Sequence, residues 1–104
     1  MELLPEEVRT QLPPLYSQEH IEDPMVICKF FHPLSHWTWY AYEFDGQDLF
    51  FGLVYGFETE FGSFSLSELE QTRGPLGLPI ERDLHFQPKK LSEVRKEHEQ
   101  HGNP

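Results

Sequence analysis

The chain has 104 residues with 18 Asp or Glu against 8 Lys or Arg, a formal net charge of -10 with neutral histidines. A folded chain of this length buries roughly 65% of its unfolded surface, which predicts a single domain over residues 1–104. The acidic excess argues against direct nucleic-acid binding, because phosphate contacts require clustered Lys and Arg.

The number of cysteines and the length of the apolar runs indicate in which cellular compartment the protein is expected. Cys28 is the single cysteine, which excludes an internal disulfide framework and a multi-cysteine zinc site and suits a reducing compartment. The first residues carry acids around broken apolar pieces, the reverse of a secretory signal, and every apolar run is far shorter than the ~20 residues that cross a bilayer. We therefore expect a soluble, cytoplasmic protein without membrane contact.

The N-terminal third is predicted to form one short helix and one strand. Pro5 with Glu6 and Glu7 predicts a helix over residues 5–12, which Pro13-Pro14 ends. After an irregular segment, the β-branched and aromatic run at residues 25–31 predicts a buried strand that ends at His32-Pro33.

Residues 37–64 carry 11 of the 15 aromatic residues of the chain and are predicted to form its core. Two strand-like runs, 37–44 and 49–55, are joined through residues 45–48, where Asp-Gly supplies the positive φ of a tight hairpin turn. Over residues 57–61 Phe and Thr alternate with Glu, which predicts apolar side chains inward and acids outward. A four-stranded antiparallel meander over residues 25–64 follows, with Gly56 as a turn or bulge.

The C-terminal third is predicted to be helical at two places. Overlapping Ser-x-x-Glu capping boxes predict a helix over residues 65–72, and residues 90–99 are expected to form a thin surface helix before a frayed tail. Between them lie a structured loop at 73–83 and a short edge strand at 84–86. In that loop we expect Arg73 and Arg82 to pair with carboxylates of the sheet.

Together these elements predict an α+β fold, a small antiparallel sheet of about four or five strands with two or three short flanking helices. The core is expected within about residues 5–88, and residues 89–104 form the surface helix or frayed tail.

An acidic stretch is the sharpest functional signal, since no Lys or Arg occurs between Lys29 and Arg73. One interpretation is a DNA-mimicking face that occupies a basic groove of a partner protein, with carboxylates in place of phosphates. The alternative is that these acids only confer solubility and block edge pairing. The residues concerned are Glu43, Asp45, Asp48, Glu58, Glu60, Glu68 and Glu70.

The aromatic residues of the strands offer a second candidate surface. A base-stacking platform would need cationic surroundings, which residues 30–72 lack, so most of these rings are expected to fill the core. A small interior cannot hide all of them, and some are therefore expected at an interface or groove. The candidates are Trp37, Trp39, Tyr40 and Tyr42.

Metal binding and catalysis are not expected. Cys28, His32 and His36 have a spacing that would align on a helix, but Pro33 and the strand-like context spoil that geometry, so we expect no metal and no cofactor. No Gly-x-Ser-x-Gly elbow, phosphate loop or nucleophile with a base partner is present, which argues against an enzyme. A small hydrolase or metal-dependent enzyme remains the competing class.

Three segments carry a family resemblance: WTWYAYEFDGQDLFFGLVYG, FGSFSLSELE and RGPLGLPIERDLHF. From residues 12–19 to Leu91 the chain resembles a family of small bacterial proteins described only as a domain of unknown function. The resemblance implies an accessory protein of plasmids, phage or other mobile elements, found beside conjugation and antirestriction genes. It brings no catalytic residue and no cofactor.

The resulting hypothesis is a non-enzymatic acidic binding protein that inhibits a host nucleic-acid-binding defence complex, of the antirestriction or anti-CRISPR type. The alternative is an accessory subunit that uses an exposed aromatic patch. Its partner would be a protein with a basic groove, and its oligomeric state stays open.

Overall fold

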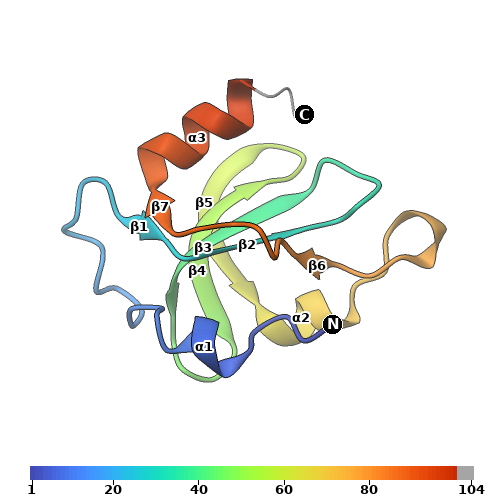
Figure 1. Cartoon of the computed structure of the whole chain (residues 1–104), viewed down its shortest axis with the longest axis horizontal. Helices are drawn as coiled ribbons and strands as arrows, with labels where there is room; N and C mark the ends of the chain where they lie inside the picture. Colours follow the sequence, from blue (N-terminus) through green and yellow to red (C-terminus); the bar gives the residue numbers. More distant parts are fainter. Residues whose placement is uncertain (101–104) are drawn as a thin grey trace.

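The computed structural model of the protein describes residues 1–100 and contains a five-stranded antiparallel sheet in the order β5-β4-β3-β2-β6 (Figure 1). Its strands are β2 (Cys28–Phe31), β3 (Thr38–Phe44), β4 (Leu49–Tyr55), β5 (Thr59–Ser65) and β6 (Glu81–Arg82). A second sheet pairs β1 (Met25–Val26) with β7 (Lys89–Lys90). The α-helices of this described region are α1 (Glu6–Arg9), α2 (Leu66–Gln71) and α3 (Leu91–Gln100), and a short 3-10 helix, η1, spans Pro75–Gly77. The predicted α+β fold is confirmed.

The meander β2 to β5 and the hairpin turn between β3 and β4 follow the prediction. Gly46 has φ of 88°, and one carboxylate oxygen of Asp45 accepts the backbone N–H groups of Gln47, Asp48 and Leu49. A glycine is favoured at such a positive φ because it has no Cβ. Gly56 lies in the turn after β4, as predicted.

Two strand predictions are wrong in their bounds. The run 25–31 is divided at Ile27, so that β1 leaves the main sheet and pairs with β7. The edge strand predicted at 84–86 lies instead at 81–82, paired with β2. Asp83 accounts for the shift, because its carboxylate accepts the N–H of His85 and its carbonyl accepts that of Phe86, which turns the chain at this point.

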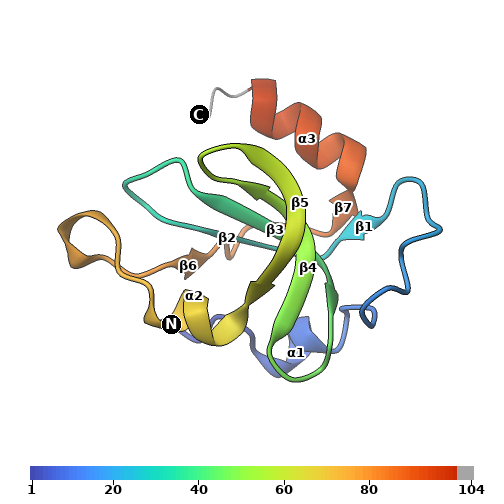
Figure 2. The ribbon, with the colours of Figure 1, turned by 180° about the vertical axis from the view of Figure 1, so that it is seen from behind.

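The sheet has two faces with separate cores. Residues of α1, α2 and the N-terminus pack on the first face around Phe30 and Phe50, whereas α3 packs on the second face around Tyr40 and Leu53. Figures 1 and 2 show α3 at one end of the molecule and α1 and α2 at the other. Because successive side chains of a strand point to opposite faces, the same strands contribute apolar side chains to both cores.

The helices differ from their predictions mainly in depth of packing. α1 is shorter than predicted, with a turn carrying the chain on to Leu12. α2 begins as the capping box predicts, because the hydroxyl of Ser65 accepts the N–H of Glu68. α3 confirms the predicted C-terminal helix, but it buries Leu91, Val94 and His98 against the second face. The tail predicted to fray lies outside the described residues.

The apolar-inward prediction for residues 57–61 is wrong. Phe57 is 91% exposed and Phe61 is 46% exposed, while Glu58 and Glu60 are exposed as predicted. β5 is an edge strand, Phe57 lies in the turn before it, and Phe61 is in register with Leu53 on the second face, where Arg95 of α3 lies over its ring. The alternating pattern predicted a strand correctly, but it did not determine whether other elements would cover the side of the strand that carries Phe.

Candidate functional site

Glu43 does not belong to an exposed acidic face, because it is only 3% exposed. A bulge in β3 at Tyr42 moves Glu43 into register with Phe51, which contacts the second core. Its two carboxylate oxygens accept the N–H groups of Tyr16 and Gln18, each at 2.9 Å. Glu43 therefore fastens the N-terminal loop to the sheet, and the expectation that it is exposed is wrong.

Asp45 and Asp48 have structural contacts of their own. Asp45 closes the β3–β4 turn, and the three N–H groups it accepts, Leu49 first, lower the pKa of its carboxyl. Asp48 accepts the hydroxyls of Ser65 and Ser67 at 2.7 and 2.9 Å and the N–H of Ser67, and these bonds lower its pKa also. Asp45 therefore holds the β3–β4 turn, and Asp48 holds the start of α2.

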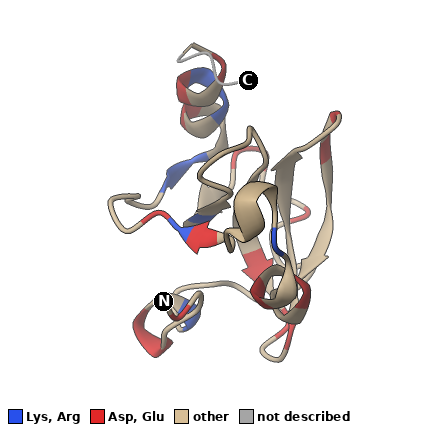
Figure 3. Ribbon diagram, turned by 90° about the vertical axis from the view of Figure 1, so that its right-hand side faces the viewer, with Lys and Arg blue, Asp and Glu red and all other residues tan. Residues whose placement is uncertain are grey.

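The other four acids of the predicted face are exposed, as Asp45 also is. Glu58 and Glu60 lie at the turn between β4 and β5 and on β5, while Glu68 and Glu70 lie on α2. Half of the eight Lys and Arg lie far from them in the chain, on β7 and α3, drawn in blue in Figure 3. The acidic surface is therefore smaller than the sequence suggested.

Trp37 and Trp39 form the centre of a surface aromatic cluster. Their rings stack with centroids 5.6 Å apart, and Phe57 meets Trp37 edge-on at 5.2 Å. A Cβ on Gly56 would lie 2.3 Å from the Trp37 ring, so the missing side chain gives that indole its place. Both tryptophans are partly exposed, whereas Tyr40 and Tyr42 are buried in the second core.

This cluster lines a hollow of about 320 Å³, here called the aromatic groove. The carboxylates of Glu58 and Glu60 stand at its rim, and at Gly62 a Cβ would have open space. A neighbouring hollow continues along α2 past Glu68. The groove is also lined by Trp37, Trp39, Val54 and Phe57.

The Cys28, His32 and His36 side chains are each engaged separately. Burial raises the pKa of the Cys28 thiol to about 12, with Arg82 acting in the opposite sense. His32 is buried, with its ring nitrogens bonded to Leu78 and Leu34, and His36 contacts the carbonyl of Gly56 at 2.7 Å. Across residues 1–100, no group of three or more His, Cys, Asp or Glu side chains is placed to hold a metal ion.

The arginines of loop 73–83 do not pair with sheet carboxylates, so that prediction is wrong. Arg73 donates to the carbonyls of Glu70 and Thr72, where α2 leaves its last carbonyls unpaired. Arg82 lies on β6, with its Nε buried and without a hydrogen-bond partner in the described chain.

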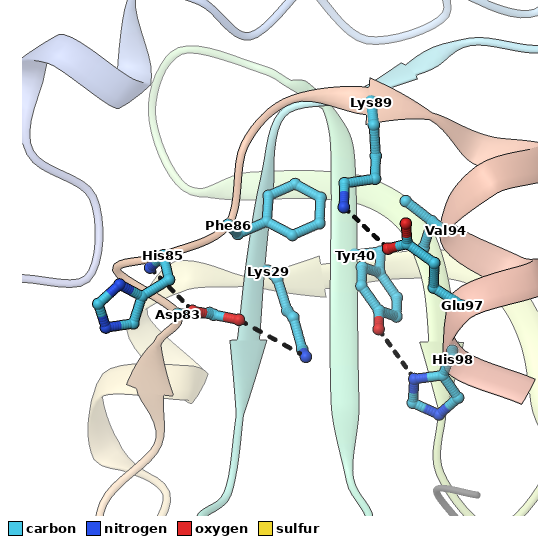
Figure 4. A pocket seen from close by; sticks show the side chains of 9 residues that line it. All are labelled: Lys29, Tyr40, Asp83, His85, Phe86, Lys89, Val94, Glu97 and His98. Carbon is cyan, nitrogen blue, oxygen red and sulfur yellow. Dashed lines mark hydrogen bonds and ion pairs between the residues drawn. The ribbon is translucent and has the colours of Figure 1, made fainter. Parts of the chain in front are cut away.

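A second hollow, here called the polar cleft, has a volume of about 230 Å³ (Figure 4). It lies between the sheet, the segment after β6, and α3. Its lining residues are Lys29, Tyr40, Asp83, His85, Phe86, Lys89, Val94, Glu97 and His98.

Charged and hydrogen-bonded pairs surround this cleft. Lys29 Nζ lies 3.6 Å from Asp83 Oδ2, and Lys89 Nζ donates to Glu97 Oε1 at 2.8 Å. Tyr40 and His98 share a hydrogen bond of 2.8 Å. Burial lowers the pKa of His98 and raises that of Tyr40, so both are neutral near pH 7, and the hydroxyl of Tyr40 and Nδ1 of His98 share one proton in this bond.

Comparison with known families gives one finding. The model of a family described as "Protein of unknown function (DUF2958)" matches residues 3–103. The chain belongs to the DUF2958 family. No curated protein and no solved structure matches it. Within residues 1–100, no helix of this DUF2958 chain is long and apolar enough to cross a membrane.

Sequence reasoning on this DUF2958 chain missed the polar cleft. Four different segments of the chain supply its polar residues: β2 carries Lys29, the loop after β6 carries Asp83, β7 carries Lys89, and α3 carries His98. The only available signal was that Lys29 is a charged residue inside a run otherwise typical of a buried strand. Such a lysine needs a polar surrounding, but its partners could not be read from neighbouring positions.

Proposed function

We propose that this chain is a non-enzymatic binding protein whose aromatic groove takes a Lys- or Arg-rich segment of a partner protein. The observation that carries the proposal is the stacked pair Trp37 and Trp39, partly exposed beside Glu58 and Glu60. Aromatic faces and carboxylates both attract cationic side chains, and here they lie in one hollow.

The groove has the features of an energetic anchor point. Cation–π contacts on tryptophan contribute about 0.5–2 kcal/mol each, depending on desolvation. The Trp37 indole is held by Trp39, Phe57 and the close approach of Gly56, so little freedom is lost when a ligand packs on it. Aromatic side chains fixed in this way are typical hot spots of protein interfaces.

The charge of the chain favours the same class of ligand. Residues 30–72 contain no Lys or Arg, and the chain carries a net charge of -10, which speeds encounter with a basic surface. Glu68 extends the acidic rim along the neighbouring hollow. A basic segment could therefore run from the β4–β5 turn towards α2.

We propose further that the partner is a nucleic-acid-binding protein of host defence, and that the chain is a mobile-element accessory factor of the antirestriction or anti-CRISPR type. The support is the acidic charge and the family resemblance of the sequence. Mimicry of DNA would then rest on the aromatic anchors and on four exposed carboxylates outside the hydrogen-bonded turn at Asp45, rather than on seven acids in one face. These carboxylates are Glu58, Glu60, Glu68 and Glu70.

Intrinsic fluorescence provides a direct test, because Trp37 and Trp39 are the two tryptophans of the chain. Titration with an oligo-arginine peptide should give a saturable change in emission, and added salt should weaken the binding. The double variant Glu58→Gln, Glu60→Gln should lose at least about tenfold in affinity. The double variant Glu2→Gln, Glu22→Gln makes the same charge change at exposed positions outside the groove and should bind nearly as wild type does.

Equal weakening in both double variants would show that net charge alone drives association, and the proposal would be wrong. The partner assignment is tested separately by co-purification with a purified type I CRISPR complex or restriction nuclease. Wild-type chain should be retained and Trp37→Ala, Trp39→Ala chain should not. Peptide binding without retention on any such complex would reject the partner while leaving the groove assignment in place.

A further inference from the structure

We propose that the polar cleft binds a small oxyanion, a carboxylate or phosphate group, between the ammonium groups of Lys29 and Lys89. These two lysines come from β2 and β7 and point into the same cleft (Figure 4). The proposal is independent of the aromatic groove, which uses none of the same residues and selects ligands of the opposite charge.

Two partly buried lysines in one hollow are costly in a small domain unless they are compensated. The Lys29 side chain is 28% exposed and that of Lys89 is 25% exposed. In the described part of the chain, Asp83 forms an ion pair with Lys29 and Glu97 forms one with Lys89. Each ammonium group therefore faces the cleft beside a carboxylate, which offsets part of the cost of its burial.

Lys29 is the better primary contact. Its Nζ lies 3.6 Å from Asp83 Oδ2, longer than the ~2.7–3.2 Å of a normal N–H···O bond, so its donors are not saturated there. The other oxygen of Asp83 accepts the N–H of His85, which holds that carboxylate in place. An oxyanion in the cleft would give Lys29 the short, charge-assisted bond that Asp83 does not.

Aromatic rings fix the two lysines in advance. Lys29 Nζ lies 5.7 Å from the centroid of Tyr40 and 5.9 Å from that of Phe31, and Lys89 Nζ lies 5.4 Å from that of Phe86. These contacts restrict the long side chains before any ligand arrives, which lowers the entropic cost of binding. Lys89 already donates to Glu97, so it supplies mainly its charge to the ligand.

Size and hydrogen bonding limit the ligand further. Sites for drug-sized ligands typically have about 300–1,000 Å³, so a cleft of about 230 Å³ suits a smaller molecule than a nucleotide. The hydroxyl of Tyr40, which lines the cleft and shares a hydrogen bond with His98 Nδ1, has acceptor lone pairs on its oxygen. It can accept a hydroxyl of the ligand, as a hydrogen phosphate or a hydroxy acid would offer.

The test is an amide NMR titration of the intact chain with inorganic phosphate and, separately, with acetate, each against sodium chloride of equal ionic strength. We expect saturable shifts at Lys29, at residues 83–86 and at Lys89. Lys29→Met keeps the apolar stem and should reduce the affinity at least about tenfold. Lys96→Met makes the same charge change at an exposed position of α3 outside the cleft and should leave the affinity unchanged.

Tighter binding of phosphate would assign a phosphate-bearing ligand, and tighter binding of acetate a carboxylate. Lys89→Met is a second variant, expected to weaken binding if Lys29→Met does not fold. Absent or unsaturable shifts in wild-type chain, or equal affinity in Lys29→Met, Lys89→Met and Lys96→Met, would overturn the proposal. Trp37→Ala should not alter the phosphate titration, so a failure here is separate from a failure of the aromatic groove.

Discussion

The aromatic groove and the polar cleft are built in opposite ways on one sheet. The groove takes its side chains from residues 37–64, a single segment that runs through β3, β4 and β5. The cleft collects Lys29, residues 83–89 and α3 from positions far apart in the chain. The aromatic groove lies where the sheet stays partly exposed, near the β4–β5 turn. The polar cleft forms because α3 covers the second face of the sheet.

The two sites also differ in charge, although one chain with a strong acidic excess carries both. The described lining of the groove has Glu58 and Glu60 but neither Lys nor Arg, whereas in the cleft Lys29 and Lys89 stand beside Asp83 and Glu97. Net charge therefore describes how the molecule meets a partner at long range, but it does not determine what each hollow binds.

The largest expected effect compares Phe50, a ring of the buried core, with Phe57, a ring that lines the aromatic groove. Phe50 is fully buried on β4, and Phe50→Ala should cost about 3–5 kcal/mol of unfolding free energy. Phe57 is 91% exposed, so the chemically identical change Phe57→Ala should alter stability by less than about 0.5 kcal/mol. Urea unfolding measures both. A large loss for Phe57→Ala would mean that this ring belongs to the core after all.

The second prediction separates structural from surface acids. Glu43→Ala leaves the N–H groups of Tyr16 and Gln18 without their acceptor, which should cost about 1–3 kcal/mol. Glu60→Ala removes an exposed carboxylate and should cost less than about 0.5 kcal/mol, while weakening capture of a cationic peptide. Chemical denaturation and the fluorescence titration together decide. Similar stability losses in both variants would contradict the division of the acids.

The parts of the fold that sequence predicted well depend on neighbouring residues. The turn at Asp45–Gly46 needs only a positive φ and a side-chain acceptor, and the start of α2 needs only Ser65 and Glu68. The aromatic, strand-like runs at 37–44 and 49–55 likewise mark strands without reference to the rest of the chain. These signals are local, and they located the segment that forms the aromatic groove.

The predictions that were wrong concern features that depend on which elements cover each face of the sheet. Phe57 and Phe61 were predicted inward because alternation says nothing of where a sheet ends. Glu43 was predicted exposed because the bulge at Tyr42 leaves no mark in the residue pattern. The cleft depends on α3 returning to the sheet over long sequence separations, which periodicity does not encode.

The third prediction concerns pH and the face covered by α3. Burial, and then Lys29, lower the pKa of His98 in the folded chain below its ordinary value of 6.5, so the unfolded chain binds the proton first. Stability should therefore be constant above about pH 7.5 and fall as the pH drops through about 6.5 towards the folded pKa. Thermal melts of His98→Gln should lose this dependence, and those of His20→Gln, at an exposed position, should retain it. The lowered pKa values of Asp45 and Asp48 act in a separate window, below about pH 4.

The smallest expected effect tests whether the groove is open. A Cβ at Gly62 meets no atom within 4 Å, so Gly62→Ala should change stability by less than about 0.5 kcal/mol. Gly56→Ala makes the same chemical change where the new Cβ would lie 2.3 Å from the Trp37 ring, so it should displace the indole and shift its emission. Thermal melts and fluorescence spectra of the two variants give the comparison. Because the added methyl of Gly62→Ala would stand in the groove without disturbing the tryptophans, it should weaken cationic-peptide binding at nearly unchanged stability, and unaltered binding would place the ligand elsewhere on the molecule.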